Sequence, residues 1–177
     1  MTTRQPVSSR QLVDRRRGLH AQSPPLGGRD HDPTYVPVFC GVEWNLWKTR
    51  QLPFNDLAVG DALFLTCPDG RGGSEIWAEG VVTDVTKERY DTMEHAWQLM
   101  VQAWPKLLSK KAWIQHRYNV GKPDTGWLLA WSYDTVRPIG VPRPPDLKFQ
   151  PNGWRRLDDI PESKLRAWDI LPMSKKP

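Results

Sequence analysis

The sequence predicts an α+β fold, a small mixed β-barrel flanked by two or three short helices. Short runs of β-branched and aromatic residues at 62–67, 76–85 and 127–136 lie between glycine- and proline-containing turns, as strands do. Residues 91–103 carry apolar side chains at steps of three and four, the spacing of an amphipathic helix. A chain of 177 residues has room for one compact domain and a tail. Short strands in one small domain favour a closed or nearly closed barrel.

The composition excludes several classes of protein. The chain has 10 tryptophans beside 4 tyrosines and 4 phenylalanines, more large aromatic side chains than a disordered chain carries. No apolar run reaches the ~18 residues that a membrane-spanning helix needs, and the N-terminus lacks the apolar core of a secretory signal. Two cysteines, Cys40 and Cys67, give no disulfide framework and no cysteine-built zinc site. We therefore expect a cytoplasmic location.

Residues 1–34 are predicted to form a flexible basic N-terminal tail, and residues 35–177 a single domain. The first 34 residues hold six arginines and three acidic residues, together with the breaker-rich stretch Ser23–Gly28. The net charge of the whole chain is +5, so most of the basic excess lies in this tail. Such a tail can contact phosphates once a partner is bound, although the charge alone does not demand a nucleic-acid partner.

The first half of the domain predicts strands and turns. Tyr35–Cys40 is a short apolar run that Pro37 restricts to an edge or a strand start. Residues 53–57 predict one helical turn, and Ala62–Cys67 predicts a buried strand. The loop at Pro68–Gly73 then leads into the strand expected at residues 76–85.

The second half predicts a helix, further strands and a closing helix. Asp91 or Thr92 can cap the helix at residues 91–103, and Pro105 follows its end. The other expected elements are an alternating strand at 112–120, a long strand at 127–136, a stiff proline-rich connector at 138–145, at best a short strand at 147–149, and a final helix from Ile160 through Trp168.

Enzyme signatures are missing from the sequence. It contains no phosphate-binding loop ending in Lys-Ser/Thr, no nucleophile elbow and no paired-histidine zinc motif. The four histidines are scattered along the chain. We therefore expect no catalytic residue, no metal site and no cofactor, and the residues favour a protein that is not an enzyme.

Five aromatic residues stand beside polar or charged neighbours, in a loop or next to a turn: Trp44, Trp47, Trp131, Tyr133 and Trp154. An exposed aromatic face stacks on a nucleobase for roughly 1–3 kcal/mol, and flanking cations can meet the phosphates. The other interpretation is that these rings only close the ends of a barrel. The hypothesis of a binding site depends on these indoles being left uncovered.

Two segments resemble a known family. Residues 57–65 (Leu-Ala-Val-Gly-Asp-Ala-Leu-Phe-Leu), followed by Ile76–Val85, are similar to the central motif of the EVE and ASCH members of the PUA-like superfamily. Trp44–Arg50 stands where EVE domains carry a tryptophan- and arginine-containing stretch, and Gly153-Trp154 resembles a late glycine-aromatic pair. The resemblance covers residues 35–157. It implies a PUA-like pseudo-barrel that holds a nucleotide, in a family that reads modified bases in DNA or RNA.

The residues and the resemblance together predict a nucleic-acid-binding module that recognises a modified or flipped base in an aromatic pocket. The expected partners are DNA or RNA and no membrane, with a separate catalytic protein as a further candidate. Alternatives are a protein–protein interaction domain that exposes a tryptophan patch, or an enzyme acting on RNA or a nucleotide through Asp134, Glu43 or Lys48. The predicted base-binding residues are Trp44, Asn45, Trp47, Trp131, Tyr133, Asp134 and Trp154, and the predicted phosphate-binding residues are Lys48, Thr49, Arg50, Arg71, Arg155 and Arg156.

Overall fold

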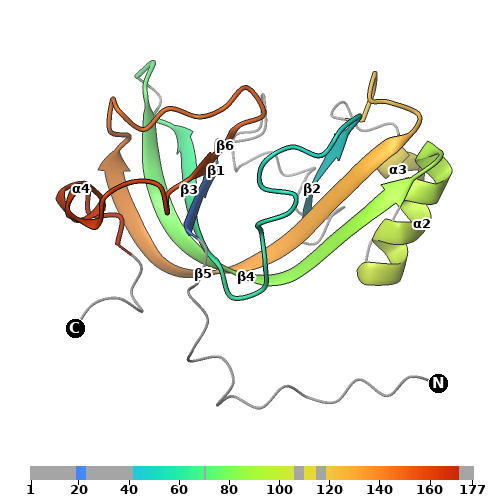
Figure 1. Cartoon of the computed structure of the whole chain (residues 1–177), viewed down its shortest axis with the longest axis horizontal. Helices are drawn as coiled ribbons and strands as arrows, with labels where there is room; N and C mark the ends of the chain where they lie inside the picture. Colours follow the sequence, from blue (N-terminus) through green and yellow to red (C-terminus); the bar gives the residue numbers. More distant parts are fainter. Residues whose placement is uncertain (1–18, 23–41, 70, 106–109, 115–118, 172–177) are drawn as a thin grey trace, which may run out of the picture.

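The computed structural model describes residues 19–22, 42–69, 71–105, 110–114 and 119–171 (Figure 1). Within these ranges the elements are β1 (Leu19–Gln22), β2 (Val42–Trp47), β3 (Ala62–Pro68), β4 (Ser74–Tyr90), α2 (Met93–Ala103), α3 (Lys110–Ile114), β5 (Gly126–Pro142), β6 (Trp154–Arg156) and α4 (Glu162–Ala167). The strands form one mixed sheet in the order β2-β5-β4-β3-β1-β6. Only β1 and β3 run parallel. The predicted α+β class is confirmed.

The centre of the sheet is a long antiparallel ribbon formed by β4 and β5, each of 17 residues. The two strands pair from Glu75 opposite Pro142 to Tyr90 opposite Gly126, with three register shifts along the way. Such irregularities bend a strand and increase its twist, and the ribbon curves strongly in Figure 1. The remaining elements are arranged on this curved ribbon.

The expected closed barrel is wrong, because the described sheet stays open. β2 pairs with Trp127–Ser132 of β5, at one end of the ribbon. β3 pairs with residues 74–81 of β4, at the other end, and carries β1 and β6 beyond it. The two outermost strands therefore extend from opposite ends of the ribbon. They have no partner strand between them through which the sheet could close.

Proline residues do not end β5 where the sequence predicts a connector. The strand continues through Pro138 to Pro142, whereas we expected it to stop at residue 136. β2 covers only the first part of β5, so among the described residues Pro138 has a strand neighbour, β4, on one side alone. An edge position tolerates proline because its missing N–H is not needed by a second neighbouring strand.

Three other elements differ from expectation. β2 occupies the segment in which we expected Trp44 and Trp47 to lie in a loop or beside a turn, and Trp154–Arg156 forms the short strand β6. The prediction of a strand at residues 112–120 is wrong for its first residues, because Lys110–Ile114 forms the helix α3. The strand expected at residues 35–40 lies outside the described residues.

Both faces of the sheet are covered by apolar clusters. The first lies between α2, α3 and one face of β2 and β5, and includes Trp44, Trp97 and Trp113. The second lies under α4 and the segment around Leu147. The third fills the opposite face of β2 and β5, and includes Trp47, Trp131 and Trp154. Because successive residues of a strand point to opposite faces, β2 contributes Trp44 to the first cluster and Trp47 to the third.

The predicted N-terminal tail is described only at Leu19–Gln22. These four residues form β1, which pairs with β3 and β6. The rest of the predicted tail lies outside the described residues, so the division of the chain at residue 34 stays a prediction. Among the described helices, none combines the length and the apolar character needed to span a membrane.

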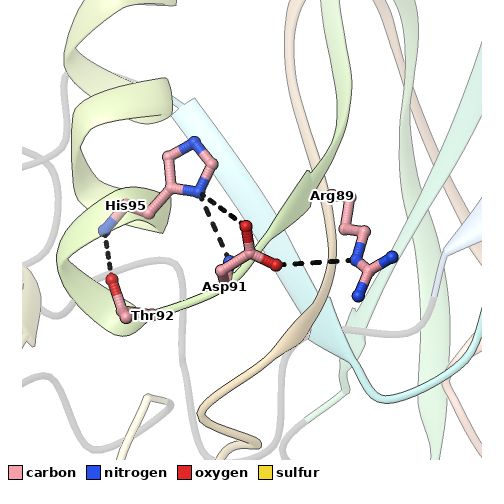
Figure 2. Close-up of polar contacts among 4 residues, drawn as sticks. All are labelled: Arg89, Asp91, Thr92 and His95. Atoms are coloured by element: carbon pink, nitrogen blue, oxygen red, sulfur yellow. Dashed lines mark hydrogen bonds and ion pairs between the residues drawn. The ribbon is translucent and has the colours of Figure 1, made fainter.

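Helix α2 starts where the sequence predicts. The hydroxyl of Thr92 accepts a hydrogen bond from the backbone N–H of His95 at 3.0 Å, and Thr92 itself has extended backbone angles (Figure 2). We expect Thr92→Ala to lower the free energy of unfolding by about 1 kcal/mol, because it leaves an N–H of the first turn without its acceptor. Urea denaturation measures this loss. Thr92→Ser keeps the acceptor and should restore most of the stability, so an equal loss in both variants would contradict the capping role.

Candidate nucleic-acid interface

The structure brings three of the predicted base-binding tryptophans together. Trp47, Trp131 and Trp154 lie in one cluster, and the rings of Trp131 and Trp154 meet edge to face with centroids 5.0 Å apart. Trp44 lies apart from them on the other side of β2. Its Nε1–H donates to the side-chain oxygen of Asn119 at 2.8 Å.

The premise that these indoles are left uncovered is wrong. The exposed fractions are 5% for Trp44, 7% for Trp47 and 1% for both Trp131 and Trp154. A ring so enclosed by its own protein offers no face to a nucleobase in this conformation. These rings instead pack inside the apolar clusters. This agrees with the alternative interpretation that they are packing residues and not a binding surface.

The other predicted base-binding residues lie in different surroundings. Asn45 is buried, at 7% exposure, within β2. Tyr133 is half-buried, and its hydroxyl donates to a carboxylate oxygen of Glu43 at 3.3 Å. Its ring also lies against Gly80, where a Cβ atom would come within 3.0 Å of the Tyr133 ring. Asp134, the next residue along, is exposed.

One aromatic ring of the third cluster does hold a cation on its face. The guanidinium carbon of Arg50 lies 3.8 Å from the centroid of the Trp127 ring and 5.6 Å from that of Phe54. Trp127 is half-buried and Arg50 is exposed. No hydrogen bond or ion pair links the Arg50 guanidinium to another described residue. The indole therefore holds one face of the guanidinium, while its N–H donors have no described protein acceptor.

The segment that carries Arg50 is fixed at several points. A helical turn, in which the N–H of Leu57 donates to the carbonyl of Pro53, confirms the turn predicted there. The side-chain amide of Asn152 donates to the carbonyl of Leu52 at 2.6 Å. Arg156 forms an ion pair with Asp56 at 3.7 Å. The segment that follows Arg50 is thus joined by direct contacts to the segment that carries Asn152 and Arg156.

Further cations surround Trp127 on the same face of the sheet. Trp127 stands opposite Trp47 on one side and Arg89 on the other, and the neighbouring pair on the ribbon is Leu129 opposite Lys87. Directly opposed residues share a face, so Lys87 and Arg89 project on the side of Trp127. We call Arg50, Lys87, Arg89 and Trp127 the Trp127 surface.

The charges at this surface are partly offset by acidic neighbours. Figure 2 shows Asp91 between Arg89 and His95, with Arg89 Nε 3.6 Å from one carboxylate oxygen. The Asp91 N–H also donates to Nδ1 of His95 at 3.3 Å. Partial burial lowers the pKa of the Lys87 ammonium from its ordinary value, and the carboxylates of Asp56 and Asp61 act in the opposite direction.

The remaining predicted phosphate-binding residues lie in different parts of the molecule and differ in exposure. Lys48 and Thr49 are exposed beside Arg50. Arg155 is half-buried in β6, while Arg156 also lies 3.8 Å from Asp158, so its charge is offset twice. Arg71 lies in the turn before β4, and Arg89 next to Trp127 lies near the end of that strand, so Arg71 is separated from the Trp127 surface by most of β4.

Sequence reasoning left three residues of this surface out of the predicted site. Trp127 was expected in a strand but not in the binding site, and the strand expected to end at residue 85 omitted Lys87 and Arg89. The alternation of Lys87, Arg89 and intervening residues on a strand extended to Tyr90 would have placed both cations on one face.

Among the described residues, no group of three or more His, Cys, Asp or Glu side chains is placed to hold a metal ion.

Comparison with known proteins gives structural similarity alone. No protein-family model matches the chain, and no curated protein matches it. The solved structure of ASCH from Zymomonas mobilis is 15% identical, with a TM-score of 0.45 over 84% of this chain and 94% of that one. A tyrosine-to-phenylalanine mutant of that protein is 16% identical, with the same TM-score of 0.45 over 85% and 98%. ASCH is one of the family names that the sequence resemblance indicates. What this chain binds has to be argued from its own residues.

Proposed function

We propose that this protein is a nucleic-acid-binding module and that the Trp127 surface is its contact region. The observation that carries the proposal is the exposed Arg50 guanidinium held 3.8 Å above Trp127, with Lys87 and Arg89 on the same face of the sheet. Proteins that bind single strands combine cations that follow the phosphates with planar groups on which bases stack. The net charge of +5 adds an attraction that acts before contact.

The proposal places nucleic-acid contacts at the surface instead of in the predicted aromatic pocket. Trp131 and Trp154 are packed against each other, so a modified or flipped base cannot enter between them without separating the two rings. A base that reaches the Trp127 surface would meet the free face of the Arg50 guanidinium, which can serve as a stacking plane in the same way as an aromatic ring. DNA and RNA are both candidate partners.

The interaction-domain alternative loses its main support. It required an exposed tryptophan patch, and the four tryptophans concerned are buried. The large hydrophobic side chains exposed among the described residues are Val59, Val120 and Val136, which come from three separate segments. No observation in the described part of the chain favours catalysis by Asp134, Glu43 or Lys48.

Fluorescence anisotropy with labelled oligonucleotides tests the proposal. DNA and RNA of one sequence, single-stranded and duplex, with plain, methylated or hydroxymethylated cytosine, should bind in the range of about 10⁻⁴–10⁻⁶ M and lose affinity as salt rises. Arg50→Ala should weaken binding and lower the slope of log K against log salt by about 0.7 for single strands or 0.9 for duplex.

The matched control for this experiment is Arg166→Ala. It removes an equal charge from α4, where Arg166 pairs with Glu162 at 3.0 Å. We expect this variant to bind as the unmodified protein does. Equal weakening by both substitutions would mean that net charge alone drives binding, and no binding of any oligonucleotide at low salt would end the proposal.

A further inference from the structure

We propose that Arg50 is a phosphodiester-recognising fork, and that Trp127 is the residue that positions it. This inference rests on the proposed function and assigns one chemical group of the nucleic acid to one side chain. The ligand group is an oxyanion that presents two acceptor atoms in one plane. What distinguishes this guanidinium is the planar arrangement of its N–H donors, which the ammonium group of a lysine, although it carries the same charge, would not reproduce.

Stacking determines which parts of the guanidinium remain for a ligand. The Arg50 guanidinium carbon lies over the Trp127 ring, 3.8 Å from its centroid, which is the contact distance of a stacked pair; in a stacked pair the indole covers one face of the guanidinium. The N–H donors lie in the plane of the guanidinium, so they point outward along the ring surface. Two parallel N–H groups match the two free oxygens of a phosphodiester, which is the bidentate pairing at which arginine exceeds lysine.

Two further observations favour a ligand on these donors. The Arg50 guanidinium has neither an ion pair nor a hydrogen bond with another described residue, although the side chain is held in place by two aromatic rings. By contrast, the Arg137 guanidinium bonds Glu79 and the Leu171 carbonyl, and Arg156 pairs with two carboxylates. Arg50 is thus oriented by the protein but has no acceptor among the residues that the structure describes. Orienting the side chain in advance reduces the conformational entropy lost on binding.

The experiment separates guanidinium geometry from charge. Arg50→Lys keeps the charge and therefore the salt slope, but we expect it to weaken oligonucleotide binding roughly five- to tenfold, because a bidentate pair becomes a single contact. Trp127→Leu should weaken binding to a similar extent, because the guanidinium is no longer held flat. Trp127→Phe keeps an aromatic face and is the matched control, with affinity close to that of the unmodified protein.

The probe distinguishes phosphate from base. A single-stranded DNA oligonucleotide and an abasic one of equal length, with tetrahydrofuran residues in place of nucleosides, carry the same phosphates. Arg50→Lys should weaken the binding of the abasic strand roughly five- to tenfold, and that of the base-containing strand at least as much, because a base stacked on the guanidinium would be lost in addition. A defect confined to the base-containing strand would show that Arg50 meets a base, and affinity of Arg50→Lys equal to that of the unmodified protein would also overturn the fork.

A second readout uses the unmodified full-length protein. The Nε–Hε cross-peak of Arg50 in a ¹H–¹⁵N spectrum, assigned by its loss in Arg50→Lys, should shift when the abasic strand is added. An unmoved cross-peak at saturating strand would overturn the inference even if a variant failed to fold. Failure of the proposed function is a different result, in which the unmodified protein binds neither strand at low salt.

Discussion

Substituting Arg137 by alanine is expected to lower the free energy of unfolding by about 3–5 kcal/mol, because it leaves a buried carboxylate without its partner. Arg137 Nε donates to a carboxylate oxygen of Glu79 at 2.6 Å, and the Glu79 side chain is only 2% exposed. The same guanidinium donates through Nη2 to the carbonyl of Leu171 at 2.7 Å, so it also ties the segment after α4 to the sheet. Urea denaturation followed by circular dichroism measures the loss.

Two controls make this prediction specific. Arg166→Ala breaks an exposed ion pair with Glu162 on α4, which is expected to cost at most about 0.3–0.5 kcal/mol. The double variant Glu79→Gln with Arg137→Met removes both charges, and it should be more stable than Arg137→Ala alone, since no buried negative charge remains without the Arg137 cation. A loss under 1 kcal/mol for Arg137→Ala would contradict the role of this pair.

Trp154→Ala is expected to cost about 3–5 kcal/mol of unfolding free energy, as large-to-small core substitutions do. The side chain is 1% exposed and meets Trp131 edge to face at 5.0 Å, so its removal leaves a cavity next to a second indole. Trp154→Phe keeps an aromatic ring and should recover part of the loss. Urea denaturation gives the free energies, and oligonucleotide anisotropy on the folded fraction gives the affinities.

The two readouts separate the core role of Trp154 from the base-stacking role that the sequence predicts. A core residue lowers stability and leaves the affinity of the folded protein unchanged. A stacking residue does the reverse, because the free energy of its contact is gained only with the bound strand. Weakened binding with unchanged stability would therefore restore the predicted aromatic pocket.

Local patterns predicted the elements whose formation depends on near neighbours. Helix α2 was placed correctly from its apolar spacing and from Thr92, because the cap and the first turn are only three residues apart. β3 and the turn at Pro53–Leu57 also followed from short segments. The final helix was expected after Pro161, and α4 begins at the next residue.

Elements that depend on distant partners were the ones misread. β2 lies in a tryptophan-rich segment with polar neighbours, and it is a strand because it pairs with Trp127–Ser132, 80 to 90 residues further along the chain. β6 likewise forms by pairing with β1. The polar neighbours of Trp44 and Trp47 suggested exposure, but in a strand adjacent residues point to opposite faces, so Asn45 says nothing about the surroundings of Trp44.

By itself, the sequence determined that this protein is an α+β chain rich in indole, with cations around residues 48–50. Tertiary structure alone decided that both faces of the sheet are covered, so that most of those indoles are buried, and that Arg50 rests on Trp127. The physical reason is that burial is set by which surfaces meet across the sheet, and those surfaces come from segments far apart in the chain.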